Sequence, residues 1–261
     1  MSRPRFAYLD APLPLAFAHR GGAAEGDENT AEAFGRAVEL GYRYLETDTR
    51  ATADGVAVVF HDDTLDRMLS RPGQMRDVRW ADLSALRIRG AAAVPRLEDV
   101  LDAWPDVRFN IDVKEDEAVD PTVTAIRRTG AMDRVLLASF SDGRVARLRR
   151  ALGPEVATSL GTRATARLWA ASRVGGPRWP VGLANRAAVQ VPVRHGRVRV
   201  VDRRFLRHAH RLGLQVHVWT IDDPTEMNEL LDLGVDGIMT DRIEVLREVY
   251  LARGCWPSDP D

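Results

Sequence analysis

The chain has 261 residues, and 45% of them are hydrophobic, which is enough apolar material for one large hydrophobic core. Its net charge is −1 with both signs interspersed, and this argues against a bulk electrostatic grip on nucleic acid or on an anionic membrane. The only cysteine, Cys255, excludes an internal disulfide framework and a cysteine-based zinc site. No apolar run reaches transmembrane length. We therefore expect one domain over residues 1–261, a reducing cytoplasmic location, and neither nucleic-acid partners nor integral membrane association.

Eight β-rich segments alternate with amphipathic, helix-like segments along the chain. The β-rich segments are "LAFAHRG", "YRYLETDTR", "RFNIDVK", "RVLLASF", "EVATSLG", "AAVQVPV", "LQVHVWTI" and "VDGIMTD", beginning at residues 15, 42, 108, 134, 155, 187, 214 and 235. Helices are expected between them, and several of these segments end in the glycine that commonly follows a helix C-terminus. The pattern predicts an α/β fold, an eight-stranded parallel (β/α)8 TIM barrel, with a doubly wound open sheet as the alternative.

A further β-rich segment, "VAVVFHD" at residues 56–62, follows the second predicted strand after the short turn signal "TADG". A parallel crossover needs about a dozen residues or more, so the two segments should form an antiparallel hairpin. We expect this β-hairpin to extend from the C-terminal end of strand two and to carry His61 back over the barrel mouth. The long connection at residues 63–106, with a short helix in "DVRWADLSALRI", is expected to cover part of the mouth.

Carboxylates converge near the C-terminal ends of two predicted strands. Because side chains alternate along a strand, Glu46 and Asp48 should share one face, and Asp112 and Lys114 should point inward from the next barrel strand. Three inward acids on neighbouring strands predict an oxygen-rich site for a hard divalent metal such as Mg²⁺ or Ca²⁺. The alternative for Glu46 and Asp48 is salt bridging to the abundant arginines.

Short motifs occur in a fixed order along most of the chain: "HRG" at 19–21, "ENT" at 28–30, "ETD" at 46–48, "VVFHD" at 58–62, "IDVK" at 111–114, "VWT" at 218–220 and "GVDGIMTD" at 234–241. This series resembles the glycerophosphodiester phosphodiesterase family. The resemblance implies a metal-dependent barrel enzyme that hydrolyses glycerophosphodiesters to an alcohol and sn-glycerol 3-phosphate.

Carried over position by position, the resemblance implies a role for seven residues. His19 and His61 would be the general acid–base pair, Arg20 and Lys114 would bind the phosphate, and the metal ligands would be Glu46, Asp48 and Asp112. The chain departs from the family at Asp112, where glutamate is usual, and the shorter side chain implies a water-mediated contact or a shifted ion. Glu28 and Asn29 either support this site or serve only as a helix start.

Lys114 and Trp219 also have a chemical reason to lie in the site. Lys114 is the only lysine among 37 basic residues, and its compact ammonium suits a crowded site beside a metal-bound phosphate better than a guanidinium does; the alternative is chance. Trp219 either forms an apolar wall for glycerol or the leaving alcohol, or packs in the core. Ser139, Phe140 and the pair Thr240–Asp241 also end strands, and we expect them to orient their neighbours or shape the pocket.

The remaining histidines and one loop receive no role in the chemistry. We interpret His208 and His210 as helix-surface residues and assign none to His195 and His217. The segment at residues 172–186, "SRVGGPRWPVGLANR", belongs to the loops that would select the alcohol, but its sequence does not indicate which one.

Three functional hypotheses follow. The first is a metal-dependent glycerophosphodiesterase acting on a small-molecule phosphodiester. The second is a lysophospholipase D-like phosphodiesterase, which an exposed apolar rim at the mouth would favour. The third is a catalytically silent phosphodiester-binding module, against which the intact histidines and acids argue.

Overall fold

The computed structural model describes residues 5–174 and 186–257, and all eight predicted barrel strands form in it. They are β1 (Leu15–Ala18), β2 (Tyr44–Ala51), β6 (Arg108–Val113), β7 (Val135–Ala138), β8 (Ala157–Thr158), β9 (Ala188–Val191), β12 (Gln215–Val218) and β13 (Gly237–Thr240). The hydrogen-bonded order is β8-β7-β6-β2-β1-β13-β12-β9, and a parallel bridge from Ser159 to Ala188 joins the two ends. This closure confirms the (β/α)8 barrel and rules out the open sheet.

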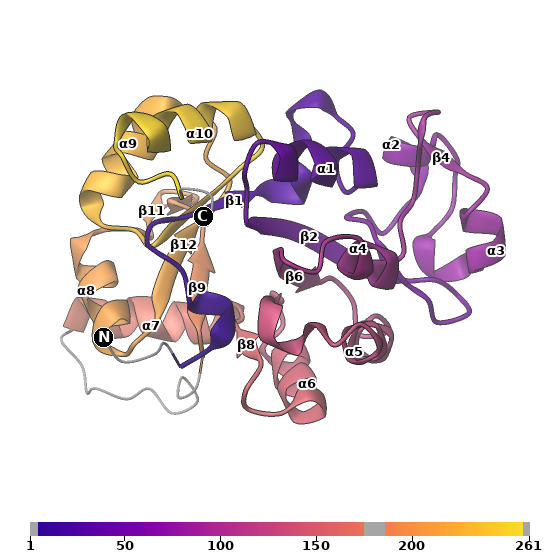
Figure 1. Cartoon of the computed structure of the whole chain (residues 1–261). Helices are drawn as coiled ribbons and strands as arrows, with labels where there is room; N and C mark the ends of the chain where they lie inside the picture. Colours follow the sequence, from indigo (N-terminus) through magenta and orange to yellow (C-terminus); the bar gives the residue numbers. More distant parts are fainter. Residues whose placement is uncertain (1–4, 175–185, 258–261) are drawn as a thin grey trace.

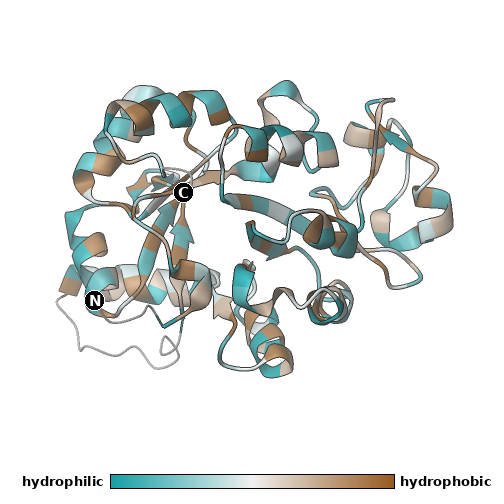
Figure 2. Ribbon diagram, in the orientation of Figure 1, coloured by the Kyte–Doolittle hydropathy of each residue, from teal (hydrophilic) through white to brown (hydrophobic). Residues whose placement is uncertain are grey.

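The strands are connected by helices that surround the barrel (Figure 1). They are α1 (Ala31–Glu39), α4 (Leu97–Ala103), α5 (Val119–Arg128), α6 (Asp142–Leu152), α7 (Thr162–Val174), α8 (Arg203–Arg211), α9 (Pro224–Leu233) and, after the last strand, α10 (Ile243–Ala252). Side-chain oxygens of Thr30, Ser141, Asp202 and Asp223 accept backbone N–H groups at the first turns of α1, α6, α8 and α9. Hydrophobic and hydrophilic residues alternate along helices such as α9 and α10 (Figure 2), as expected when only one side faces a sheet.

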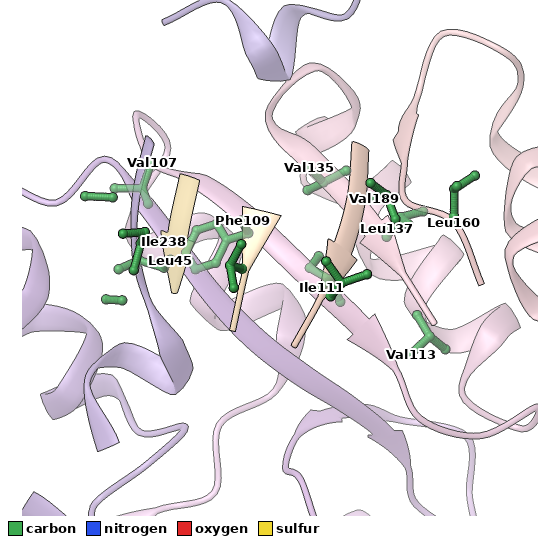
Figure 3. Packing of buried hydrophobic residues seen from close by; sticks show 14 of the residues in the cluster. Leu45, Val107, Phe109, Ile111, Val113, Val135, Leu137, Leu160, Val189 and Ile238 are labelled. Carbon is green, nitrogen blue, oxygen red and sulfur yellow. The ribbon is translucent and has the colours of Figure 1, made fainter. Parts of the chain in front are cut away.

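Alternation along the strands separates two hydrophobic layers. Phe109, Ile111 and Val113 point toward the outer helices, and the Phe109 ring contacts Phe34 of α1 edge to face at a centroid distance of 6.2 Å. Figure 3 shows part of this outer layer, with Leu45 on β2, Phe109 and Ile111 on β6, and Leu137 on β7. The side chains on the opposite face of each strand point into the barrel. They form the second hydrophobic layer there and, at the mouth, include the polar groups.

The barrel interior is filled from one end by the N-terminal segment. Tyr8, in the 3-10 helix η1 (Ala7–Leu9), packs edge on against Tyr44, and the Tyr44 hydroxyl donates to the Tyr8 carbonyl at 2.8 Å. Phe17 and Met239 belong to the same cluster. Polar groups are therefore collected at the other end of the strands.

The predicted hairpin is present. β3 (Ala57–Val59) pairs antiparallel with β2, with Thr49 opposite Val59, and Phe60 N–H donates to the Asp48 carbonyl at 3.0 Å. The connection that follows contains α2 (Asp66–Leu69), the predicted short helix as α3 (Trp80–Leu83), and the strand pair β4 (Arg87–Ile88) and β5 (Ala92–Ala93). These elements lie together at one edge of the molecule (Figure 1) around a cluster of their own that includes Leu65 and Met75.

Short elements occupy the remaining connections: η2 (His19–Gly21), η3 (Ala23–Glu25), η4 (Met75–Asp77), η5 (Ala131–Arg134), β10 (Arg194–His195) and β11 (Val198–Arg199). Within residues 5–174 and 186–257, no helix combines the length and apolar character that crossing a bilayer requires.

Candidate active site

The C-terminal ends of the barrel strands collect the residues that the sequence singled out. His19 and Arg20 directly follow β1, Lys114 follows β6 and Trp219 follows β12. Asp48 and Asp112 lie directly opposite each other in the parallel pairing of β2 and β6. His61 reaches the same end on the hairpin, two residues beyond β3, and its carbonyl accepts from Arg50 Nε of β2 at 2.9 Å. The predicted placement of His61 is thus confirmed.

The three predicted acids are buried at the mouth, as alternation required. Glu46, Asp48 and Asp112 are 5%, 1% and 9% exposed. Asn29, from the loop before α1, donates to Asp48 Oδ2 at 2.9 Å and accepts from Thr47 at 2.8 Å. The "ENT" motif therefore both starts a helix and supports the site. Thr30 caps the N-terminus of α1, and Asn29 hydrogen-bonds to Asp48.

Two cations pair with these acids. Lys114 Nζ lies 2.7 Å from Asp48 Oδ1 and 2.7 Å from Asp112 Oδ2, and Arg20 Nε lies 3.2 Å from Asp48 Oδ2. Burial alone would raise the pKa of Asp48, but Lys114 and Arg20 lower it to about 2. Asp48 therefore forms the salt bridges that the alternative prediction expected, and its partners are Lys114 and an arginine, Arg20.

Glu46 is compensated less well than Asp48. Its Oε2 accepts from the Arg20 backbone N–H at 3.1 Å and lies 3.7 Å from His19 Nε2. Burial and the neighbouring charge of Asp48 raise the pKa of Glu46 to about 7, despite the nearby cations. The mouth thus contains a carboxyl group whose ionisation a further cation would stabilise.

The described residues contain no group of three or more histidine, cysteine, aspartate or glutamate side chains already arranged around a metal position. Their chemistry nevertheless fits a divalent ion. Asp112 Oδ1 is buried and has no hydrogen-bond partner among the described residues, the Glu46 carboxylate is destabilised by burial, and the three acids offer carboxylate oxygens as ligands. Hard cations such as Mg²⁺ and Ca²⁺ prefer such donors. The metal and its ligands stay a prediction.

Each predicted catalytic histidine is held by an aspartate at Nδ1. His19 Nδ1 lies 2.6 Å from Asp241 Oδ1, and His61 Nδ1 lies 2.8 Å from Asp62 Oδ1. These contacts fix the ring orientation. Nε2 of His19 faces Glu46 at 3.7 Å, and Nε2 of His61 makes no hydrogen bond within the described part of the chain. Burial would lower the pKa of His19, but the charge of Glu46 and the hydrogen bond to Asp241 raise it above its ordinary value.

The sequence motifs indicated only part of this arrangement. An orienting role was expected for the strand end that holds Asp241, but none was assigned to Asp62 or to Arg67 of α2. Arg67 hydrogen-bonds to both Asp62 and Glu28. The sequence signal for Asp62 was its position directly after His61, whereas the contacts of Arg67 depend on how α2 docks at the mouth.

An aromatic pair stands beside the charged cluster. Trp219 is half-buried, packs against the barrel interior, and meets the edge of Phe140 at a centroid distance of 6.0 Å. Phe140 is 59% exposed, and Lys114 Nζ lies 5.9 Å from its ring centroid. Trp219 thus borders the mouth as expected, and its contact with substrate stays a prediction. Residues 175–185 of the alcohol-selecting segment, with Trp179, lie outside the described part of the chain.

The assignment of His208 to a helix surface was wrong. His208 is buried because it lies on the inner side of α8 with Phe205 and Ala209, while His210 is exposed and bonds to Asp236 at 2.7 Å. His217 is fully buried inside the barrel against Phe17, where burial lowers its pKa to about 3. Neither buried histidine belongs to the cluster at the mouth.

Comparison with known proteins places this geometry in a family. The model of the "Glycerophosphoryl diester phosphodiesterase family" matches residues 19–245. A Mycobacterium tuberculosis protein named "Probable glycerophosphodiester phosphodiesterase 2" is 43% identical over 257 residues, which cover 97% of each chain.

Solved structures share the fold. A glycerophosphodiester phosphodiesterase from Agrobacterium tumefaciens superimposes with a TM-score of 0.74 at 23% identity, covering 92% of this chain and 100% of that one. An Oleispira antarctica phosphodiesterase, solved with the product sn-glycerol-3-phosphate, gives a TM-score of 0.76 at 21% identity, covering 91% and 96%. The full-length sequence relative and the family match together show that the chain belongs to the glycerophosphoryl diester phosphodiesterase family.

Proposed function

We propose that this chain hydrolyses glycerophosphodiesters to an alcohol and sn-glycerol 3-phosphate, with a divalent metal and with His19 and His61 as the acid–base pair. The observation that carries the proposal is the arrangement at the mouth, where two histidines, each bonded to an aspartate, lie beside buried acids and two partly buried cations. The product bound to the Oleispira antarctica phosphodiesterase supports the same substrate class. The single cysteine supports a cytoplasmic location.

Arg20 and Lys114 provide the positive charge for the phosphate group. A phosphodiester is an anion that gains charge on its oxygens during attack, so fixed cations lower the barrier. A divalent metal held by Glu46, Asp48 and Asp112 would supply further charge neutralisation at the phosphate. Lys114 already contacts two of these acids, so its ammonium lies beside the groups that would hold the metal.

The two histidines divide the proton transfers. His19 ends β1 within the barrel mouth, whereas His61 arrives on the hairpin, so the rings can approach the phosphate from different sides. We assign His19 as the base that accepts a proton from the nucleophile and His61 as the acid that protonates the leaving alkoxide. The family resemblance, rather than distance, favours this order over its reverse.

A lysophospholipase D-like activity is the second candidate. The exposed Phe140, with Trp219 beside it, gives the mouth an apolar rim that an acyl chain could contact. Comparing kcat/KM for glycerophosphocholine and for lysophosphatidylcholine separates the two substrate classes. Binding of either compound without turnover would instead indicate the silent binding module.

The decisive experiment measures turnover of glycerophosphocholine before and after exhaustive chelation. We expect chelation to abolish activity and Mg²⁺ or Ca²⁺ to restore it. Asp112→Asn should weaken metal affinity without unfolding the protein, while Asp106→Asn, an exposed aspartate preceding β6, should leave the metal titration unchanged. Full activity after metal removal would refute the metal dependence.

The division of labour has its own test. His61→Ala should lower turnover of choline esters by roughly 10² to 10⁴, the usual contribution of a general acid, but should spare esters of p-nitrophenol, whose departure needs no proton. His19→Ala should impair both kinds of substrate. Equal losses for His61→Ala on both esters would contradict its role as the acid.

A further inference from the structure

Arg67, on α2, places one guanidinium between carboxylates from two different loops. Its Nε and Nη2 donate to the two oxygens of Asp62 at 2.6 and 2.9 Å. Its Nη1 and Nη2 donate to the two oxygens of Glu28 at 2.8 and 2.7 Å. Arginine can make this double bidentate arrangement because its five donors lie in one plane, whereas the ammonium of lysine cannot.

Both carboxylates also contact residues of the reaction centre. Asp62 Oδ1 accepts from Nδ1 of His61, and Glu28 Oε1 accepts from Nη1 of Arg20 at 2.8 Å. Arg67 is therefore separated by a single side chain from the proposed general acid and from a proposed phosphate ligand. Its own side chain is 44% exposed, while those of Asp62 and Glu28 are mostly buried.

We propose that Arg67 is a positioning residue, which fixes Asp62 against His61 and Glu28 against Arg20 and so couples α2 to both the proton donor and the phosphate site. This role rests on the function proposed above. The segment after β3 then contributes more than a cover for the mouth. Its docking decides whether the hairpin histidine is held in place.

Loss of Arg67 should act through both carboxylates. Among the described residues, Asp62 would keep only His61 as a side-chain partner, so its carboxylate would rotate more freely and hold the imidazole less firmly. Arg20 would be the one side-chain partner left to Glu28 among the described residues. The Glu28 carboxylate, no longer paired with Arg67, would then compete with the substrate phosphate for the Arg20 guanidinium. The first effect lowers kcat where the leaving group needs a proton, and the second raises KM for every substrate.

The test compares Arg67→Ala with Arg71→Ala, an exposed arginine just after α2 for which the described residues show no hydrogen bond or ion pair. For Arg67→Ala we expect kcat on glycerophosphocholine to fall about 10- to 100-fold, as for other residues that orient a catalytic group. On the p-nitrophenyl ester kcat should be nearly kept, while KM rises for both. Arg67→Lys should recover part of the loss, and Arg71→Ala should match the unmodified protein.

A second measurement does not depend on turnover. The Nδ1 proton of His61, bonded to a carboxylate, should give a low-field imidazole proton signal in NMR, which His61→Ala assigns by its disappearance. This signal should broaden or vanish in Arg67→Ala and persist in Arg71→Ala. If Arg67→Ala does not fold, Asp62→Asn, which removes the same carboxylate contact with Arg67, should reproduce the leaving-group dependence.

Two results would overturn the assignment. One is an equal loss of kcat on both esters, and the other is an unchanged His61 signal in Arg67→Ala. If the unmodified protein turns over neither ester, the proposed function fails, and the NMR comparison alone still decides whether Arg67 holds Asp62 against His61.

Discussion

Identical side chains acquire opposite properties in this barrel, because burial and neighbouring charge act separately on each one. His217 is buried against an aromatic ring and has no carboxylate partner among the residues that the structure describes, and its pKa falls to about 3. His19 is also mostly buried, yet Glu46 and Asp241 raise its pKa above the ordinary value. His217 therefore stays neutral at neutral pH, whereas His19 holds a proton more readily than an ordinary histidine does.

Asp241→Asn tests the control of His19. Removing the carboxylate at Nδ1 takes away a hydrogen bond and a charge that favour the imidazolium, so the pKa of His19 in the metal-free protein should fall. NMR titration of the imidazole signals measures it. Asp236→Asn is the matched control, because it removes the partner of His210 and should not move the His19 titration. An unchanged His19 pKa in Asp241→Asn would contradict this account.

Glu46 predicts a pH dependence of metal binding. Its carboxyl has a pKa of about 7, so below that pH a metal must displace a proton, and affinity should weaken up to about tenfold per pH unit. Above pH 7 the dependence should level off. Competition with a coloured chelator between pH 5.5 and 8 measures the affinity in wild type and in Glu46→Gln, whose weaker binding should vary less with pH. A flat wild-type profile would refute the prediction.

At the scale of secondary-structure elements, the short connection between β2 and β3 is the reason that the hairpin at the barrel mouth could be predicted from the sequence. The few residues between β2 and β3 permit only an antiparallel hairpin, and the observed pairing of Thr49 with Val59 carries the chain back beside Asp48. The N-terminal segment behaved differently, since nothing in its sequence indicated that η1 would close the opposite end of the barrel. Its burial depends on the width of the assembled barrel.

Tyr8 of η1 offers a matched pair of substitutions. The side chain is 1% exposed and packs on Tyr44, so Tyr8→Ala should cost about 3 to 5 kcal/mol, as in other losses of a buried aromatic ring. The Tyr8 hydroxyl is buried and has no hydrogen-bond partner in the described parts of the chain, so Tyr8→Phe should be neutral or slightly stabilising. Urea unfolding of both variants measures the free energies. A large loss for Tyr8→Phe would show that the hydroxyl is satisfied in solution.

At the scale of the whole molecule, the barrel is not equally bonded around its circumference. β2 and β6 pair over six positions, from Tyr44–Arg108 to Thr49–Val113. Between the ends of the sheet, the described residues form one bridge, from Ser159, just after β8, to Ala188 of β9. A few backbone hydrogen bonds, among them Leu160 N–H to the Ala188 carbonyl at 3.1 Å, complete this seam. Opening of the barrel should therefore begin there.

Hydrogen exchange measures this difference. The amides of Leu160 and Ala187, which donate across the seam to the carbonyls of Ala188 and Thr158, should exchange faster than those of β2 and β6, because opening a short seam breaks fewer contacts than separating two long strands. Mass spectrometry of peptides from each region, collected under native conditions, gives the comparison. Equal protection of the seam and of the β2–β6 pair would contradict it.

The sequence by itself determined the strand–helix alternation, the hairpin and the inward direction of Glu46, Asp48 and Asp112, because each depends on local periodicity or on the length of a connection. It also placed His19 and His61 at strand ends. Only the tertiary structure decided that β8 and β9 close the sheet, that His208 is buried, and which partners the site residues have. Asp241 contacts His19 across 222 positions of sequence, and Arg67 reaches Glu28 across 39. Such contacts depend on the packing of the whole barrel, for which local sequence patterns carry no signal.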